Sequence, residues 1–488
     1  MAETTRTNGR FMRSRIANPA LAVAVAFGLL TSGCTTVSNW FGDEKPKEGT
    51  VGFVSGFLGA VSGDEPQAVL AARKVLSAGG NAVDAAVGGI FALTVTLPSR
   101  AGLGGGGGCL AHRGDSKAIG YPDAFMFLPQ APAAPEGADR PAAAPMLARG
   151  LFLMHARQGK ARFESLIAVG EQLARDGVPA SRALVRDLAV VAGPLAGDPA
   201  AREIFLPGGR PIAEGALMVQ ADLGSTFAQL RRLGVGEMHL GATSQRFLAG
   251  AKLAGAGLTA EDLRKALPQQ TAPIILSPTE QIAISFLPGP ADGGLAAAVA
   301  YQTLAANPGA FAEAKSRALG AAAVYRRGGV LPEAILNGAV APSGSLPPLP
   351  ASTSFAVMDR EGNAVTCAIT MGNLFGTGRI ASGTGVVLAA SPAWMPPPLL
   401  SAGMVTQRRD SQLRVMAGGS GQDGAPVAVG LAIARSLADP RPNFTADPAA
   451  SPEPGRANVI GCNRGVTAPE SCGWTTDSRG FGLATGSN

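Results

Sequence analysis

Histidine, aromatic residues and charge are all scarce in this chain. Its 488 residues include only three histidines, 5% aromatic residues and 16% charged residues, against a typical charged share of about 25%. The five cysteines and three histidines show no C-x-x-C or H-x-x-x-H spacing, so we expect no metal site and no cofactor. No basic stretch with interleaved aromatics occurs, which argues against nucleic-acid binding.

What the chain does have is apolar and small residues. Hydrophobic residues make up 46% of it, and 66 glycines and 37 prolines are spread along its length. This composition predicts a well-buried globular body rather than a disordered one. The formal charge is +6, but residues 1–33 hold four arginines and Glu3, a net +3. The remainder therefore carries 6 − 3 = +3, which is too little to suggest an acidic partner.

The N-terminus has the layout of a targeting segment. Four arginines precede an apolar run from Ala20 to Leu30, which is too short to span a bilayer. Leu30-Thr31-Ser32-Gly33-Cys34 then resembles a bacterial lipobox, with Thr31 where leucine is usual. We expect residues 1–33 to be a lipoprotein signal peptide, Cys34 the lipidated residue and 34–50 a tether. The protein would then sit on the periplasmic side of the cell envelope, lipid-anchored in the outer membrane; an ordinary secretory signal or a short anchor is the alternative.

The stretch from Pro350 to Gly378 is the most informative part of the chain. A Ser-Thr-Ser run, residues 352–354, leads into alternating apolar residues, a turn at 359–363 and a second apolar run ending at Ile369. This order predicts a β-hairpin with a cluster of hydroxyl groups at its entrance. On the hydroxyl residues alone, a polar turn before a strand is the simpler interpretation.

The whole stretch resembles the start of the small subunit of γ-glutamyltransferases. That family shows Thr-Thr-His-Phe/Tyr, then Asp-x-x-Gly-Asn-Ala-Val, then Phe-Gly-x-Gly, and an ungapped alignment places Ser352 on its nucleophile. The resemblance implies self-cleavage between Ala351 and Ser352, after which the freed α-amine, of pKa about 8, serves as general base. Such an enzyme needs no histidine. It also implies an α/β fold of the N-terminal nucleophile hydrolase type, a four-layer αββα sandwich.

A second block, residues 64–108, supports the same family. Helical spacing over Pro66–Ala78 is followed by Gly-Gly-Asn-Ala-Val-Asp-Ala-Ala, an apolar helix over Asn81–Leu97, Pro98 and a glycine-rich loop, which is the order that the family shows. The loop matches G-x-G-x-x-G only formally, because no strand precedes it, and no Lys-Ser/Thr follows as in a P-loop. We expect its glycines to let the backbone pass close to a neighbouring strand.

Further short motifs, scattered from Pro145 to Leu295 and again at residues 475–484, fit the family in order and spacing. The implied organisation is a large-subunit-like region over 51–351, a small-subunit-like region over 352–440, and a Pro/Ala-rich connector with a terminal hairpin over 441–488. The resemblance assigns the orienting hydroxyl to Thr370 and the oxyanion-hole N–H groups to Gly418 and Gly419.

The residues that would hold a γ-glutamyl group depart from the family pattern. Pro122 falls in the place of the family's carboxylate-binding arginine, Gly372 in that of an asparagine, and residues 379–409 contain no Asp or Glu. Thr353, Ser401 and Arg100 are the remaining candidates for substrate binding, and Arg379 is a second possible replacement for the arginine.

The cysteines differ by location. Cys109 and Cys367 lie in apolar runs, where we expect buried thiols. Cys462 and Cys472 lie in the polar tail, where export makes a disulfide plausible.

The sequence therefore predicts a γ-glutamyltransferase-family enzyme that hydrolyses or transfers the acyl group of γ-glutamyl compounds such as glutathione, or of a related amide, through an acyl-enzyme. Two alternatives stay open. One is an acylase or amidase for a non-glutamyl acyl group; the other is a catalytically inactive, lipid-anchored scaffold, which an uncut mature chain would favour.

Overall fold

A computed structural model describes residues 58–114, 120–134, 138–439 and 451–487, which belong to one compact unit spanning Glu48–Asn488. The signal peptide, the tether and Cys34 lie outside the described residues. None of the described helices is long and apolar enough to cross a membrane.

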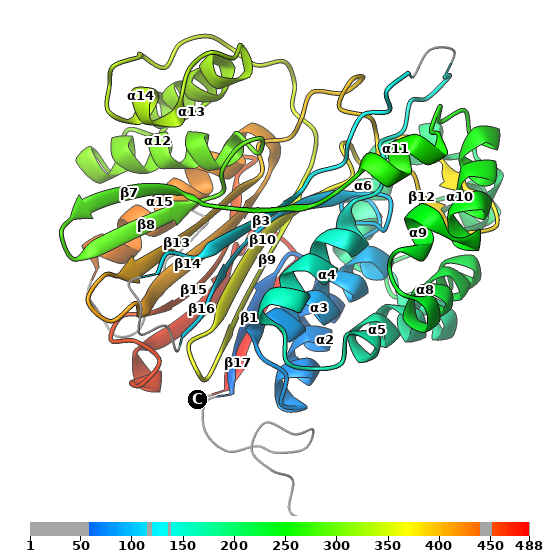
Figure 1. Cartoon of the computed structure of the whole chain (residues 1–488), viewed down its shortest axis with the longest axis horizontal. Coiled ribbons are helices and arrows are strands. Elements are labelled where there is room, and N and C mark those ends of the chain that lie inside the picture. The colour runs from blue at the N-terminus through cyan, green and yellow to red at the C-terminus, as the bar shows by residue number, and fades with distance from the viewer. Residues whose placement is uncertain (1–57, 115–119, 135–137, 440–450, 488) are drawn as a thin grey trace, which may run out of the picture. The chain divides into compact units, whose positions relative to one another are not determined.

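Two antiparallel sheets form the centre of this unit (Figure 1). The first has the order β17–β1–β9–β10–β2–β3–β6 and the second the order β16–β15–β14–β13–β8–β7. The strands of the first sheet are β17 (Leu483–Ser487), β1 (Gly59–Gly63), β9 (Thr353–Asp359), β10 (Ala364–Thr370), β2 (Gly106–His112), β3 (Asp123–Phe127) and β6 (Gln269–Thr271). Those of the second are β16 (Cys472–Thr476), β15 (Arg456–Cys462), β14 (Leu413–Ser420), β13 (Ser401–Gln407), β8 (Ile282–Phe286) and β7 (Ile274–Thr279).

Helices cover the outer face of each sheet, on opposite sides of Figure 1. The first sheet carries the larger group: α2 (Pro66–Ser77), α3 (Ala82–Thr96), α4 (Leu147–Gln158), α5 (Phe163–Asp176), α6 (Arg182–Leu195), α7 (Pro199–Phe205), α8 (Ala221–Leu233), α9 (Glu237–Leu240), α10 (Ala242–Leu253) and α11 (Ala260–Lys265). The second carries α12 (Gly293–Ala306), α13 (Phe311–Arg326), α14 (Pro332–Leu336) and α15 (Ala425–Ala438). Two short pairs, β4 (Val178–Pro179) with β5 (Leu217–Met218) and β11 (Ile380–Ala381) with β12 (Val386–Val387), complete the fold.

Alternation along β9 shows how the layers are held together. Phe355 and Val357 join the core beneath the larger helical group, whereas Ala356 and Met358 join the core between the two sheets. Successive side chains of a strand point to opposite faces, so β9 contributes side chains to both hydrophobic cores. The predicted αββα sandwich is confirmed, and so are the hairpin and the two helices around Gly79-Gly80.

The glycine-rich segment passes close to its neighbours, as expected, although part of it is a strand rather than a loop. A Cβ on Gly106 would lie 2.1 Å from the Phe127 carbonyl oxygen, and one on Gly107 would lie 2.3 Å from that of Ala368. Real Cβ atoms do not approach backbone oxygens so closely, so only glycine allows β2 to lie between β3 and β10 at this end. The segment thus positions the end of β10 at Thr370.

Candidate active site

The proposed cleavage point lies at the entrance of β9, beside the end of β10. The two strands pair antiparallel, with Ile369 opposite Thr353, so the same register brings Thr370 opposite Ser352. The Thr370 hydroxyl donates to the carbonyl oxygen of Ala351 at 3.1 Å and accepts from the Gly372 N–H at 2.9 Å. This carbonyl belongs to the peptide bond that the sequence marks for cutting.

Ser352 itself is almost fully buried, at 1% exposure. Among the residues that the structure describes, no partner is found for its hydroxyl. By the alternation of β9, Ser352 and Ser354 share the face directed at the second sheet. A buried hydroxyl without a partner, next to a carbonyl that already accepts a hydrogen bond, is suited to attack that carbonyl.

Asp64, directly after β1, holds the entrance of β9 in place, and sequence reasoning gave it no role. Its Oδ2 accepts from the Thr353 hydroxyl at 2.9 Å and from the Ser354 N–H at 3.2 Å, and its Oδ1 accepts from Asn458 Nδ2 at 2.7 Å. Asn458 also donates to the Ser354 hydroxyl at 2.8 Å and accepts from that of Ser62 at 3.2 Å. One carboxylate therefore connects strands of both sheets beside Ser352.

The expected oxyanion glycines lie within β14, which has a neighbouring strand on each side. A Cβ on Gly418 would lie 3.0 Å from Ser354 Cβ, and one on Gly419 would lie 2.7 Å from a methyl group of Val429 in α15. Close packing of the second sheet against the first sheet and against α15 thus accounts for both glycines. Their role in an oxyanion hole stays a prediction.

The three expected substrate-binding side chains have other partners in the structure. Thr353 donates to Asp64, and the Ser401 hydroxyl lies 3.1 Å from the carbonyl oxygens of both Gly293 and Leu399. Arg100 donates through two nitrogens to Asp187, at 2.7 and 2.8 Å. Burial lowers the pKa of Arg100, but the charge and hydrogen bonds of Asp187 raise it, with a net rise. Each of these side chains therefore fastens the scaffold in this structure, and a role in substrate binding stays a prediction.

The strand register shows where Pro122 lies relative to the first sheet. Ala111 of β2 pairs with Asp123, and Gly107 pairs with Phe127, so Pro122 lies at the end of β3 away from Thr370. The residues that leave β3 at the reacting end are Leu128 and Pro129.

The cysteines form two disulfides among the described residues. Cys462 is joined to Cys472 across the β15–β16 hairpin, and Cys109 is joined to Cys367. The latter pair corrects the expectation of buried thiols. Cys109 of β2 and Cys367 of β10 are directly opposite each other in the register of the first sheet, which a single sequence does not reveal.

A cavity of about 330 Å³ opens beside Thr370. Thr370 and Gly372 form its wall at the reacting end, and Leu128 and Pro129 border it. Among the residues that the structure describes, no charged side chain lines it. Arg379, the second candidate for the missing arginine, is outside this lining and donates instead to Asp139 and to the Ala254 carbonyl.

Comparison with known proteins agrees with this geometry. The family model described as gamma-glutamyltranspeptidase matches residues 68–324. The glutathione hydrolase proenzyme of Bacillus subtilis (strain 168) is 30% identical over 42% of this chain and 37% of its own length. That of Escherichia coli (strain K12) is 27% identical over 68% of this chain and 65% of its own length, so this chain spans less than two thirds of either relative.

Among solved structures, the cephalosporin acylase from Bacillus halodurans has a similar fold, with a TM-score of 0.69. It is 18% identical, and the match covers 91% of this chain and 99% of that one. At this identity the likeness concerns the fold alone. The family match, the four-layer fold and the hydroxyl cluster at the entrance of β9 together establish that the chain belongs to the gamma-glutamyltranspeptidase family.

Proposed function

We propose that this protein is a self-processing amide hydrolase or acyltransferase that uses Ser352 as its N-terminal nucleophile. The observation that carries the proposal is the hydrogen bond from Thr370 to the carbonyl oxygen of Ala351. That bond draws electron density from the carbonyl carbon, and the Ser352 hydroxyl lies next to it in the chain with no partner among the described residues. Hydrogen bonds directed at an oxygen that gains charge are a major source of catalysis.

Processing proceeds in two balanced steps. The Ser352 oxygen bonds to the Ala351 carbonyl carbon, the C–N bond breaks, and the proton lost by the hydroxyl passes to the departing nitrogen. Water then hydrolyses the resulting ester, which gives the carboxyl terminus of Ala351 and the free α-amine of Ser352. In its neutral form this amine accepts the hydroxyl proton in each later attack on a substrate amide.

A denaturing gel of the purified protein tests processing. Because Cys109 precedes the cut and Cys367 follows it, their disulfide holds the two pieces together; two bands are therefore expected only with reductant. Ser352→Ala should remain one band under both conditions, and Thr370→Val should cut at least tenfold more slowly. The second piece should begin with Ser352 by N-terminal sequencing. A wild-type chain that stays uncut after native folding would leave the inactive scaffold as the function.

Two classes of acyl donor compete. The named relatives are glutathione hydrolases, which favours γ-glutamyl compounds such as glutathione. The uncharged lining of the cavity beside Thr370 favours the acylase alternative, because the α-carboxylate and α-ammonium of a glutamyl group both need partners when they leave water. Release of glutamate from glutathione by the processed protein is the direct measurement for the first class.

We also propose that the protein is exported and anchored in the outer membrane through a diacylated Cys34. Support comes from the basic, apolar and lipobox-like order of residues 6–34, and two acyl chains suffice for stable anchoring. Cys34→Ala should shift the protein from the membrane fraction to the soluble periplasmic fraction or stall it as a precursor. Unchanged membrane association, with the signal peptide removed, would contradict lipidation.

A further inference from the structure

Thr370 is the residue that links the cavity to the carbonyl group that Ser352 is proposed to attack. Thr370 contacts the Ala351 carbonyl oxygen with its hydroxyl and also lines the cavity. During processing the group on the carbonyl side of the broken bond is transferred to Ser352, as is the acyl group of an external substrate. Because Thr370 is shared, we expect an acyl group attached to Ser352 to reach this cavity.

The walls of the cavity consist largely of aliphatic and thioether side chains. Met126 and Leu128 come from β3 and the residue after it, Met146 from the start of α4, and Leu267 and Met395 from two loops. Prolines 396–398 form one wall as a continuous segment. Methionine adapts to irregular apolar shapes, and the volume falls at the lower end of the usual range for small-molecule sites, about 300–1,000 Å³.

Two cations lie behind these walls, and both have partners. Arg326 forms an ion pair with Asp292 and donates to the Pro397 carbonyl oxygen at 2.6 Å. Arg149 donates through Nη1 to the carbonyl oxygens of Leu263 and Ala266. Neither arginine is among the lining residues. A carboxylate inside the cavity would therefore lose its hydration without gaining a charged partner there, which is costly.

We propose that the acyl donor is an N-acyl amide whose acyl chain is uncharged and apolar, and that this cavity binds the chain. The proposal rests on the proposed function of Ser352 and specifies its substrate. In the reaction, the Ser352 oxygen bonds to the acyl carbonyl carbon and the amide C–N bond breaks. The α-amine of Ser352 takes the hydroxyl proton and passes it to the leaving amine. Water then cleaves the ester, which releases a carboxylic acid with an apolar chain.

A series of 4-nitroanilides tests the proposal on the processed wild-type protein. The acyl groups are acetyl, butyryl, hexanoyl, octanoyl and decanoyl, together with γ-glutamyl and the dicarboxylic half-amide glutaryl. Each methylene that the cavity buries should raise kcat/KM by up to about fourfold, the factor that corresponds to about 0.8 kcal/mol, until the cavity is full. The best of the fatty acyl donors should exceed both γ-glutamyl and glutaryl donors at least tenfold.

A variant that places a negative charge at the edge of the cavity tests whether the cavity binds the acyl chain. Leu267 lines the cavity yet is 58% exposed, so Leu267→Glu leaves the core intact. It should reduce kcat/KM for octanoyl at least tenfold and for acetyl much less, with processing unchanged. Leu331→Glu makes the same substitution at a position that is 72% exposed and outside the cavity, and it should leave the whole series unchanged.

The outcomes separate this inference from the proposed function. A protein that cuts itself at Ser352 but prefers γ-glutamyl or glutaryl donors, or shows no dependence on chain length, overturns the apolar cavity while Ser352 chemistry stands. A glutaryl preference that Arg149→Met abolishes would show that Arg149 reaches the substrate, which also overturns the inference. An uncut chain that hydrolyses none of the donors refutes the proposed function, and the inference with it.

Discussion

Replacing Asp64 by asparagine should loosen the entrance of β9 more than any single substitution of the surrounding hydroxyls. The carboxylate accepts three hydrogen bonds through two oxygens, from Thr353, Ser354 and Asn458. Asparagine has one acceptor oxygen and one NH₂ group, so in one orientation it faces the Asn458 Nδ2 donor and in the other the Ser354 N–H. A flip of Asn458 would turn its Nδ2 away from the Ser354 hydroxyl, to which it donates.

The substitution thus removes at least one hydrogen bond to a charged group, each of which contributes about 1.5–3 kcal/mol. Urea unfolding in the uncut Ser352→Ala background should show this as a fall of about that size in the free energy of unfolding. In the protein that keeps Ser352, the lost hydrogen bond should also slow self-cleavage. The rate should fall about tenfold for each 1.4 kcal/mol by which the loss raises the activation free energy of cleavage. A reducing gel sampled over time measures the rate.

The matched control is Asp176→Asn at the exposed end of α5, which should change stability by no more than about 0.5 kcal/mol. An Asp64→Asn protein that is as stable as its parent and cuts itself at the wild-type rate would refute the role we give this carboxylate. A stable variant with slow processing would restrict that role to positioning the nucleophile.

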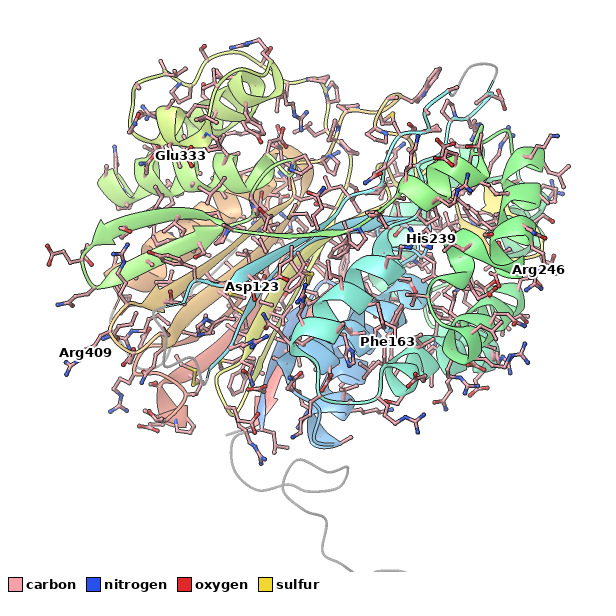
Figure 2. The ribbon with its side chains drawn as sticks, in the orientation of Figure 1. Asp123, Phe163, His239, Arg246, Glu333 and Arg409 are labelled. Carbon is pink, nitrogen blue, oxygen red and sulfur yellow. A yellow bond between two sulfur atoms is a disulfide. The ribbon has the colours of Figure 1, made fainter. Side chains whose placement is uncertain are left out.

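Three further results are expected. Burial lowers the pKa of His239, which lies among the helices that cover the first sheet (Figure 2), to about 4 from 6.5; the unfolded chain therefore binds more protons between these values, and His239 by itself should lower stability by about 2 kcal/mol on going from pH 7 to pH 5. Burial raises the pKa of Asp359 to about 6 and so acts in the opposite direction, which means that the His239 share is the difference between the wild type and His239→Gln in parallel urea titrations. Gly105→Ala should destabilise the protein and slow processing, because its Cβ would lie 2.4 Å from the Thr370 carbonyl oxygen; wild-type values on both gel and melt would contradict this. Loss of the Cys462–Cys472 disulfide in Cys472→Ser should cost about 2–3 kcal/mol, and peptide mapping without reductant that finds both thiols free in the wild type would contradict the bond itself.

The sequence predicted the parts of this site whose signals are local. The hydroxyl run, the alternating apolar residues after it and the turn at 359–363 were enough to predict the hairpin. The glycines of β2 predicted that its backbone lies close to a neighbouring strand. Asp64 escaped notice because its partners are 289 to 394 residues away, and next to Glu65 it looked only like an acidic start to a helix. The Cys109–Cys367 pair and the place of Pro122 both depend on strand register, which side-chain periodicity within one strand does not encode.

The strand order of the first sheet has a consequence for assembly. Strands from before the cut, such as β1 and β2, are interleaved in space with β17, β9 and β10 from after it, so neither piece contains the whole of the first sheet. Each alone would expose unpaired strand edges, and cleavage therefore has to follow folding. After the proposed cut, two pieces without a covalent link would form an obligate heterodimer whose melting depends on protein concentration. The Cys109–Cys367 bond would keep the melting of the proposed cleaved form unimolecular, so its two pieces would stay together on dilution.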